Sequence, residues 1–459
     1  MDGLTYETKN GWTDDRLNNQ AEIFSFCEDY KKYLDAAKTE RLACDEAVRM
    51  ARENGFCDIS EKQALKAGDR VYFVNRAKSV YLAVIGEEDI QDGINFVIAH
   101  IDSPRLDLKQ NPLYEDSDLS LFKTHYYGGI KKYQWTTIPL SLIGVMYTKD
   151  GKKVDINIGE NEGDPVFCVT DLLPHLATAQ MQKKLSEAIE GENLNILIGS
   201  IPDGGSEKDK FKQNILKILF EKYHVTEEDF LSAEIEAVPS FKAADVGLDR
   251  SMVGGYGQDD RVCAYTALKA ILNTKAVKRT AVCVLVDKEE IGSMGNTGMR
   301  SAFFEYATAT LVEKLYGTYH ELMLKRVFRN SACLSSDVSA AVDPSYGDVN
   351  EKMNAAFVGR GIVMNKYTGS RGKSGTSDAN AEFVFAVRKL FHDNQILWQS
   401  AELGKVDAGG GGTIAQYVAN LDVQVLDCGV ALLSMHAPFE IASKLDIYTA
   451  YQAYLAFYK

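Results

Sequence analysis

Short apolar runs that end in polar or acidic residues recur along the chain, and they predict buried strands. The clearest run is residues 281–286, six apolar residues rich in valine. Such a run is typical of a strand buried on both faces of a parallel sheet. Three carboxylates follow at once in the stretch 287–295. Because ligands of open α/β sheets bind at the carboxyl ends of strands, this stretch is the centre of a candidate site.

The first hundred residues combine helical and strand-like patterns. Residues 13–54 show helical periodicity, and the runs 71–74, 81–85 and 94–99 have the pattern of strands. The last of these strands leads directly into His100 and Asp102. Alternation of this kind predicts a mixed α/β layer.

The pattern changes in the middle of the chain. Residues 137–145 alternate as a strand does, and the Asp150-Gly151 dipeptide that follows predicts a hairpin turn. Helices are expected near residues 171–189 and 209–223. This middle part carries no dense set of catalytic residue types, which favours an inserted second domain.

From about residue 245 the first pattern returns. It predicts a helix at 262–272, strands at 332–334 and 423–426, and a last helix from about 440 to 458. We therefore expect a catalytic domain made of residues 1–107 and 245–459, interrupted by an inserted domain at 108–244.

Composition narrows the class of protein. A chain of 459 residues is too long for one ordinary core, and its net charge of -14 disfavours nucleic acid or an anionic membrane as a general partner. No apolar run reaches membrane length, and the acidic first twenty residues do not have the pattern of a secretory signal. The eight cysteines have no CxxC spacing, so we expect a reducing, cytoplasmic compartment.

Two imidazoles and three carboxylates lie beside predicted strand ends or a helix start. Imidazole together with carboxylate suits zinc, and also manganese or cobalt. One carboxylate that bridges two ions would give each ion three protein ligands and leave room for water. The five residues are His100, Asp259, Glu290, Asp337 and His436.

Glu289 and Asp102 complete the candidate site. Glu289, next to a ligand, is the candidate general base. Asp102 has the spacing to accept the second imidazole N–H of His100 and so fix its tautomer. Each residue alone has an ordinary structural explanation, such as a solvated acidic turn or a helix cap. Their shared placement at strand ends is what predicts a site.

These residues occur within longer motifs, and further motifs accompany them in order along nearly the whole chain. The full set resembles that of the aspartyl aminopeptidase (aminopeptidase I) family. The motifs are His100-x-Asp102-Ser103-Pro104, Tyr127-Gly128-Gly129, Leu173-Pro174-His175-Leu176-Ala177, Asp259-Asp260-Arg261, Asp287-x-Glu289-Glu290-Ile291-Gly292-Ser293, Ser336-Asp337, Gly411-Gly412-Thr413-Ile414 and Met435-His436.

The resemblance implies a di-metal exopeptidase of the α/β class, with a phosphorylase/hydrolase-like mixed-sheet catalytic domain. It also implies that the β-rich inserted domain is a dimerisation or lid domain that builds a homo-oligomer, a tetrahedral dodecamer in family members. One ion, most simply Zn²⁺, would take His100, Asp259 and Asp337. The other ion would take Asp259, Glu290 and His436.

The sequence departs from the family pattern at two positions. Many relatives have Leu-Asp-Asn where this chain has Gln258-Asp259-Asp260, so Asp259 and Asp260 are alternative bridging ligands. Relatives also carry a histidine that reaches a neighbouring subunit's active site, and Ala179 stands at that position here.

The resemblance implies peptide substrates and a preference for N-terminal Asp or Glu. The cations Lys366, Arg371 and Lys373 lie in one glycine-rich loop, and the family's specificity lysine aligns near Lys366. Gly411 and Gly412 would allow close approach of the peptide backbone. The alternatives are a broad-specificity aminopeptidase acting on neutral N-terminal residues and a non-peptidase hydrolase on the same metal site.

Two rival functions explain less. A glycosidase needs two facing carboxylates, but Glu289 and Glu290 are adjacent and would point oppositely on an extended chain. An oligomeric binding or storage scaffold leaves the strand-end residues without a purpose. The loop at 369–374 is not a phosphate-binding loop, because Tyr367 stands where that motif needs glycine.

Overall fold

A computed structural model describes residue 4, residues 6–14 and residues 19–459, which form two compact units. The first unit comprises the described residues up to Asp102 together with Ala243–Met435 and Phe439–Lys459. The second comprises Ser103–Lys242 and the short segment His436–Pro438. These limits lie a few residues from those of the predicted insert, 108–244. Within the described part of the chain, no helix is both long and apolar enough to cross a membrane.

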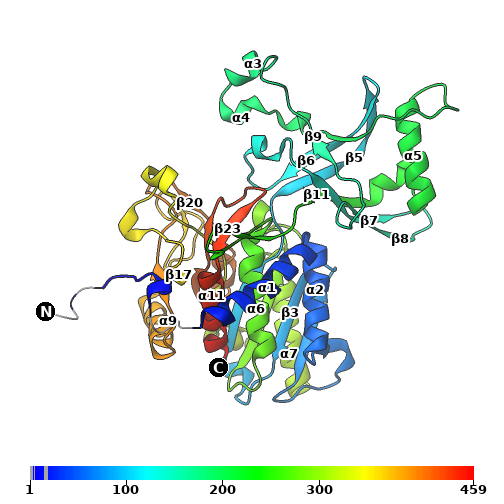
Figure 1. Ribbon diagram of the computed structural model, residues 1–459. Helices are drawn as coiled ribbons and strands as arrows, with labels where there is room; N and C mark the ends of the chain where they lie inside the picture. The colour runs from blue at the N-terminus through cyan, green and yellow to red at the C-terminus, as the bar shows by residue number, and fades with distance from the viewer. Residues whose placement is uncertain (1–3, 5, 15–18) are drawn as a thin grey trace. The chain divides into compact units, whose positions relative to one another are not determined.

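A nine-stranded mixed sheet forms the centre of the first unit, in the order β1-β2-β3-β14-β4-β15-β21-β17-β19 (Figure 1). β14 is buried along its whole length, as predicted. It runs parallel to β4 but antiparallel to β3, so the sheet is not wholly parallel. The strands are β1 (Cys57–Asp58), β2 (Arg70–Asn75), β3 (Ser79–Val84), β4 (Ile94–His100), β14 (Thr280–Val286), β15 (Ala332–Ser335), β17 (Ile362–Asn365), β19 (Trp398–Ser400) and β21 (Gln424–Gly429).

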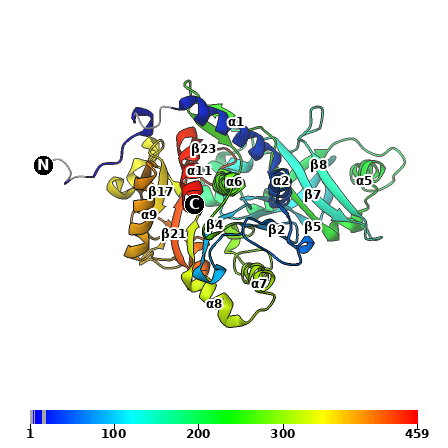
Figure 2. The ribbon, with the colours of Figure 1, turned by 90° about the horizontal axis from the view of Figure 1, so that it is seen from below.

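Helices cover both faces of this sheet (Figure 2). α1 (Gln20–Ala36), α2 (Glu40–Glu53), α6 (Gln258–Asn273), α9 (Ala381–Asp393) and α11 (Lys444–Tyr458) supply the core on one face. α7 (Phe303–Tyr316), α8 (Glu321–Asn330) and α10 (Ala415–Ala419) supply it on the other.

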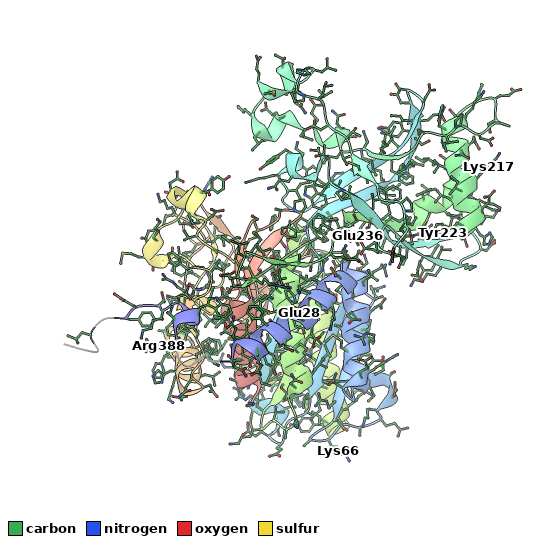
Figure 3. All side chains as sticks on the ribbon, in the orientation of Figure 1. Glu28, Lys66, Lys217, Tyr223, Glu236 and Arg388 are labelled. Atoms are coloured by element: carbon green, nitrogen blue, oxygen red, sulfur yellow. The ribbon has the colours of Figure 1, made fainter. Side chains whose placement is uncertain are left out.

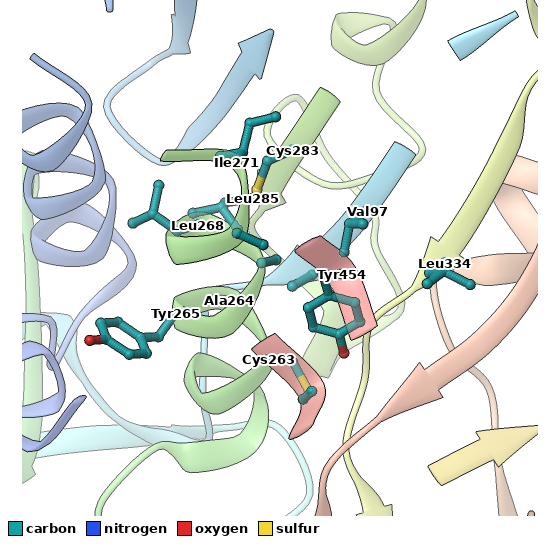
Figure 4. Packing of buried hydrophobic residues seen from close by; sticks show 14 of the residues in the cluster. Val97, Cys263, Ala264, Tyr265, Leu268, Ile271, Cys283, Leu285, Leu334 and Tyr454 are labelled. Atoms are coloured by element: carbon teal, nitrogen blue, oxygen red, sulfur yellow. The ribbon is translucent and has the colours of Figure 1, made fainter. Parts of the chain in front are cut away.

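The alternation of side chains along β14 divides it between these two cores. Cys283 and Leu285 pack with Leu268 of α6 (Figure 4), whereas Val282 and Val284 belong to the opposite core. Full burial of a side chain such as leucine contributes roughly 1.5–3 kcal/mol. The strand is therefore held by packing on both faces, and the segment that follows it from Asp287 begins at a fixed position.

Two smaller sheets complete the first unit. Five strands run in the order β12-β13-β23-β22-β16, and β18 pairs with β20. The predicted last helix is wrong at its start, because Glu440–Ser443 form β23 against β13. The helix begins only at Lys444, where the Ser443 side chain accepts the N–H of Leu445. The other strands are β12 (Ala244–Val246), β13 (Met252–Gly255), β16 (Ser339–Ala340), β18 (Gly369–Ser370), β20 (Gly410–Gly411) and β22 (Ala431–Leu433).

The second unit is built on a seven-stranded sheet in the order β8-β7-β11-β5-β6-β10-β9. The predicted Asp150-Gly151 hairpin is confirmed, since it joins the antiparallel strands β7 and β8. α5 (Lys210–Tyr223), on which Figure 3 labels Lys217 and Tyr223, begins as predicted near residue 209. The strands are β5 (Arg105–Asp116), β6 (Leu119–Tyr127), β7 (Leu140–Tyr147), β8 (Lys153–Ile158), β9 (Cys168–Val169), β10 (Ile196–Gly199) and β11 (Ala233–Pro239).

The helix predicted near residues 171–189 is wrong. Only α3 (Thr178–Met181) and α4 (Leu185–Ala188) form there. Pro174 interrupts the segment, and its apolar side chains Leu173, Leu176 and Met181 are exposed. Without a buried face to pack, a long helix gains too little to form.

Asp446 on α11 is a buried carboxyl group that should make stability depend on pH. Its two oxygens each accept a backbone N–H at 2.7 Å, from Gly359 and Gly361. Burial nevertheless raises its pKa from the ordinary 3.8 to about 7. The folded state therefore holds this proton more tightly than the unfolded state, and the stability that it contributes is lost as pH rises towards 7.

Asp446→Asn should flatten this pH dependence. Between pH 4 and pH 7 the wild-type free energy of unfolding should carry an extra fall of up to about 1.4 kcal/mol per pH unit, which the variant lacks. Urea unfolding over this pH range measures the slope. Asp393→Asn, which changes an exposed carboxylate at the end of α9, is the control. Equal slopes in wild type and Asp446→Asn would contradict the assignment.

Candidate metal centre

His100 ends the central strand β4 and is fully buried. Its Nε2 lies 3.2 Å from Asp259 Oδ1 and 4.0 Å from Asp337 Oδ1. All three residues offer ligand atoms within 4.8 Å of one another. Because β4 lies between β14 and β15 in the sheet, the chain segments that leave these strands meet at its end. The first unit therefore brings together three of the predicted metal ligands.

Asp102 connects this cluster to the stretch that follows β14. Its Oδ1 lies 3.3 Å from Nδ1 of His100. The same carboxylate accepts the backbone N–H of Glu289 at 3.1 Å and that of Glu290 at 3.2 Å. A carboxylate behind a ligating imidazole fixes its tautomer and orientation. Asp102 is thus in contact with both His100 and the backbone of the candidate base.

Asp259 and Asp260, at the start of α6, have different surroundings. Asp259 faces Nε2 of His100, and its backbone N–H donates to the buried carboxylate of Glu440 at 3.1 Å. Asp260 is directed at the strand instead, where its Oδ2 accepts the backbone N–H of His100 at 3.3 Å. Of the two bridging candidates, Asp259 therefore has the geometry of a metal ligand.

Glu289 and Glu290 lie in the short 3-10 helix η8 (Glu289–Ile291). Glu289 Oε2 is 4.0 Å from His100 Nε2, and its side chain is only 18% exposed. Glu290 offers a ligand atom within 4.8 Å of one on Asp259. The turn of η8 gives the two neighbouring carboxylates separate positions at the site.

A glycine on the next strand allows Asp337 to reach its position. Asp337 follows β15, and a Cβ added to Gly429 of β21 would lie 1.9 Å from the carbonyl oxygen of Asp337. Only glycine permits this approach. Gly429 and Glu440 are the two supporting residues that sequence reasoning missed, because each acts through a contact with a residue far away in the chain.

Several acidic side chains are buried close together in this cluster, among them Asp102, Asp259 and Asp260. Burial and then the charge of Asp260 raise the pKa of Asp337 well above its ordinary value. Burial opposes a charged His100, yet hydrogen bonds to Asp102 and Asp259 raise its pKa well above the usual value. A divalent cation would relieve this crowding of acids. One imidazole and two carboxylates are also a donor set that zinc accepts, so the residues fit that ion.

His436, the last predicted ligand, lies in the segment His436–Pro438 of the second unit. It follows β22 by three residues, in a left-handed conformation with φ of 64°. Its Nδ1 lies 2.7 Å from the carbonyl oxygen of Gly129. A proton on Nδ1 that is donated to this carbonyl leaves the Nε2 lone pair for a ligand.

The predicted substrate residues come together in a second place within the first unit. β18 and β20 pair Gly369 with Gly411, which brings the loop of Lys366 beside Gly411 and Gly412. Lys366 is half exposed, and its Nζ lies 3.2 Å from Asp378 Oδ1. The neighbouring Asn365 donates to the hydroxyl of Ser339 at 3.5 Å, two residues beyond Asp337.

Imidazole and carboxylates gathered at the strand ends of a mixed α/β sheet are the donor set that a metal-dependent hydrolase needs. A family model described as aminopeptidase I zinc metalloprotease (M18) matches residues 33–458. The chain belongs to this family of zinc aminopeptidases, as its motifs predict.

Relatives match along essentially the whole chain. The probable M18 family aminopeptidase 1 of Clostridium acetobutylicum is 54% identical and covers 99% of this chain and 98% of its own. The crystal structure of an M18 aminopeptidase from Thermotoga maritima has a TM-score of 0.96 at 46% identity, covering 99% of this chain and 100% of that one. The S. cerevisiae structure titled mApe1 dodecamer, with a TM-score of 0.77 at 16% identity over 95% of this chain and 97% of that one, shares the fold.

Proposed function

We propose that this aminopeptidase holds two metal ions bridged by Asp259. His100 and Asp337 would complete one site, and Glu290 and His436 the other. The mutual distances of His100, Asp259 and Asp337 support the first site. The second is supported by Glu290 beside Asp259 and by chain connectivity. His436 is bonded to Met435 of the first unit, and neighbouring Cα atoms are only ~3.8 Å apart.

Glu289 and Asp102 would have different roles in peptide hydrolysis. Bound zinc supplies a Lewis acid and lowers the pKa of a coordinated water. Glu289 takes a proton from the attacking water and returns it to the departing amine. Asp102 holds the imidazole of His100 in one orientation.

The observation that carries this proposal is the set of carboxylates around Nε2 of His100, which includes Asp259, Asp337 and Glu289. Elemental analysis of the purified protein should find two ions per chain. Exhaustive chelation should abolish hydrolysis of aminoacyl substrates, and zinc, manganese or cobalt should restore it. Full activity of the metal-free protein would contradict the proposal, and one ion per chain would contradict the bridged pair.

We further propose that the enzyme prefers an acidic N-terminal residue, which Lys366 would recognise. Burying a carboxylate costs free energy unless a cation or hydrogen-bond donors pair with it. Lys366 and Lys373 already share Asp378, at 3.2 and 2.8 Å. A substrate carboxylate would have to compete with Asp378 for Lys366. The alternative, broad specificity for neutral residues, predicts no role for this lysine.

Lys366→Ala should lower kcat/KM for N-terminal Asp by ~1.5–3 kcal/mol, roughly 10- to 150-fold, the range for hydrogen bonds to charged groups. Activity on an N-terminal Leu substrate should stay nearly unchanged. Lys373→Ala is the matched control, because it removes the other partner of Asp378 at similar exposure. An equal loss on both substrates, or a wild-type preference for Leu, would favour the broad-specificity alternative.

We also propose that the second unit mediates assembly into a homo-oligomer, up to the dodecamer of family members. Several large apolar side chains on its surface are exposed, among them Leu172, Leu176, Met181 and Leu185. These four side chains lie within residues 172–185, and exposed apolar surface is typical of an interaction site. Ala179 lies between Leu176 and Met181, in the region where relatives carry the intersubunit histidine.

Light scattering at micromolar concentration should show a particle several times heavier than the 50.9 kDa chain. Leu176→Glu combined with Met181→Glu should shift it towards smaller species. Leu231→Glu, an exposed leucine elsewhere in this unit, should not. A wild-type monomer would rule out this role for the second unit.

A further inference from the structure

We propose that Arg261 is a positioning residue for the metal centre, because its buried guanidinium fixes the backbone between His100 and Asp102. The ligand assignment of His100 rests on the proposed function above. Arg261 is 1% exposed and lies in the first turn of α6, two residues after Asp259. It follows the two aspartates in the motif, yet neither metal binding nor proton transfer gives it a role.

Arg261 and the preceding residue, Asp260, form hydrogen bonds to the backbone of two adjacent residues of the site. Arg261 Nε donates to the carbonyl oxygen of Ile101 at 3.2 Å. Asp260 Oδ2 accepts the N–H of His100 at 3.3 Å. The N–H of Ile101 donates to the carbonyl of Val286, at the end of β14, at 2.8 Å. The peptide units around Ile101 are therefore held both by α6 and by β14.

The hydrogen bond from Arg261 to the Ile101 carbonyl acts on the residue between the proposed ligand His100 and Asp102. Ile101 separates His100, which faces Asp259 and Asp337, from Asp102, which holds the imidazole. The Ile101 carbonyl belongs to the peptide group that joins Ile101 to Asp102, so its rotation would turn Asp102 and displace the carboxylate that holds the imidazole of His100. Loss of the Arg261 donor therefore changes the orientation of the imidazole, although Arg261 contacts neither ring nor ion.

The partners of Arg261 also differ from those of Arg105, another buried arginine. Arg105, in the second unit, pairs with the carboxylates of Asp107 at 2.8 Å and Glu236 at 3.2 Å. Among the residues that the structure describes, no carboxylate lies within ion-pair distance of Arg261; its guanidinium donates to the Ile101 carbonyl and lies 5.4 Å from the centroid of the Tyr256 ring. Buried ions are normally paired, because removing a charge from water is costly. Here the guanidinium instead donates to the backbone carbonyl of Ile101, the residue between His100 and Asp102.

The test compares Arg261→Met and Arg261→Lys with Arg70→Met. Arg70 is the matched control, since its guanidinium donates to carbonyls at the other end of α6, Thr274 at 2.6 Å and Leu272 at 2.8 Å. For each folded variant, chelator competition gives the zinc dissociation constant, steady-state assays separate kcat from KM, and thermal unfolding of the metal-free protein reports stability.

Arg261→Met should weaken zinc binding by ~10- to 100-fold, the usual effect of removing a group that orients a ligand. It should lower kcat with KM within about twofold. Arg261→Lys, which keeps a charged donor, should recover part of the zinc affinity. Arg70→Met should lower the unfolding temperature and leave zinc affinity unchanged.

Zinc affinity within twofold of wild type in Arg261→Met, with only the unfolding temperature reduced, would overturn the inference. An equal loss in Arg70→Met would do the same. If Arg261→Met does not fold, Arg261→Lys is the deciding variant. Wild-type zinc affinity and wild-type kcat in Arg261→Lys would show that the guanidinium of Arg261 is dispensable and would overturn the inference. Absence of zinc binding in the wild type would instead overturn the proposed function, and this inference with it.

Discussion

Glu289→Gln should lower kcat by ~10²–10⁴-fold, the usual contribution of a general base. The amide keeps the size of the side chain but cannot accept the proton of the attacking water. Glu289 is close enough for this role, since its Oε2 lies 4.0 Å from His100 Nε2. Zinc content should stay at the wild-type level, because Glu289 is not among the proposed ligands.

Glu290→Gln is the informative comparison for this variant. It changes the adjacent residue in the same 3-10 helix, but it removes a proposed ligand and should reduce metal content as well as rate. Elemental analysis and single-turnover rates on the same samples separate the two effects. A Glu289→Gln enzyme within threefold of wild type, roughly 0.6 kcal/mol in activation free energy, would exclude the base assignment.

His100→Ala and His436→Ala should each remove the imidazole of one proposed site. We expect each variant to lose about one ion per chain and to fall by at least ~10²-fold in kcat/KM, because the remaining ion cannot position both water and carbonyl. In His100→Ala the buried carboxylates also lose a neighbouring donor, so the metal-free protein should be less stable.

Metal content after gel filtration, measured by elemental analysis, is the deciding quantity for both histidines. His392→Ala is the control, since that imidazole is 88% exposed at the end of α9. Two ions per chain in His436→Ala would remove His436 from the second site and leave its Nδ1 contact with Gly129 as its only assigned role.

Much of the site could be predicted because its residues follow visible patterns. His100 and Glu289 stand just beyond apolar runs, and these runs became β4 and β14. The spacing of Asp102 from His100 was enough to predict their contact. A ligand that follows a buried strand can be found from local sequence, since both the strand and its end are local properties.

The rest depends on contacts that local patterns do not encode. Asp259 and Asp260 both stand at a helix start, and only the fold shows which carboxylate faces the imidazole. Glu440 was predicted in a helix, yet it lies in a strand and accepts the backbone N–H of Asp259, which is 181 residues away in the sequence. The antiparallel pairing of β3 with β14 likewise left no signal in either strand.

The position of β4 in the sheet sets the order in which a growing chain can gain activity. Its strand neighbours, β14 and β15, are synthesised about 180 and 240 residues after it, and Asp337 follows β15 directly. A ribosome-bound chain from which only β4 has emerged lacks the neighbouring strands that bury His100. It also lacks the carboxylates of the proposed ligand set. If His100, Asp259 and Asp337 hold zinc as proposed, this site can form only after roughly three quarters of the protein has emerged, so an unfinished chain should not cut peptides near the ribosome. For the same reason we expect a truncated chain that ends before Asp337 to be inactive, however well its first strands fold.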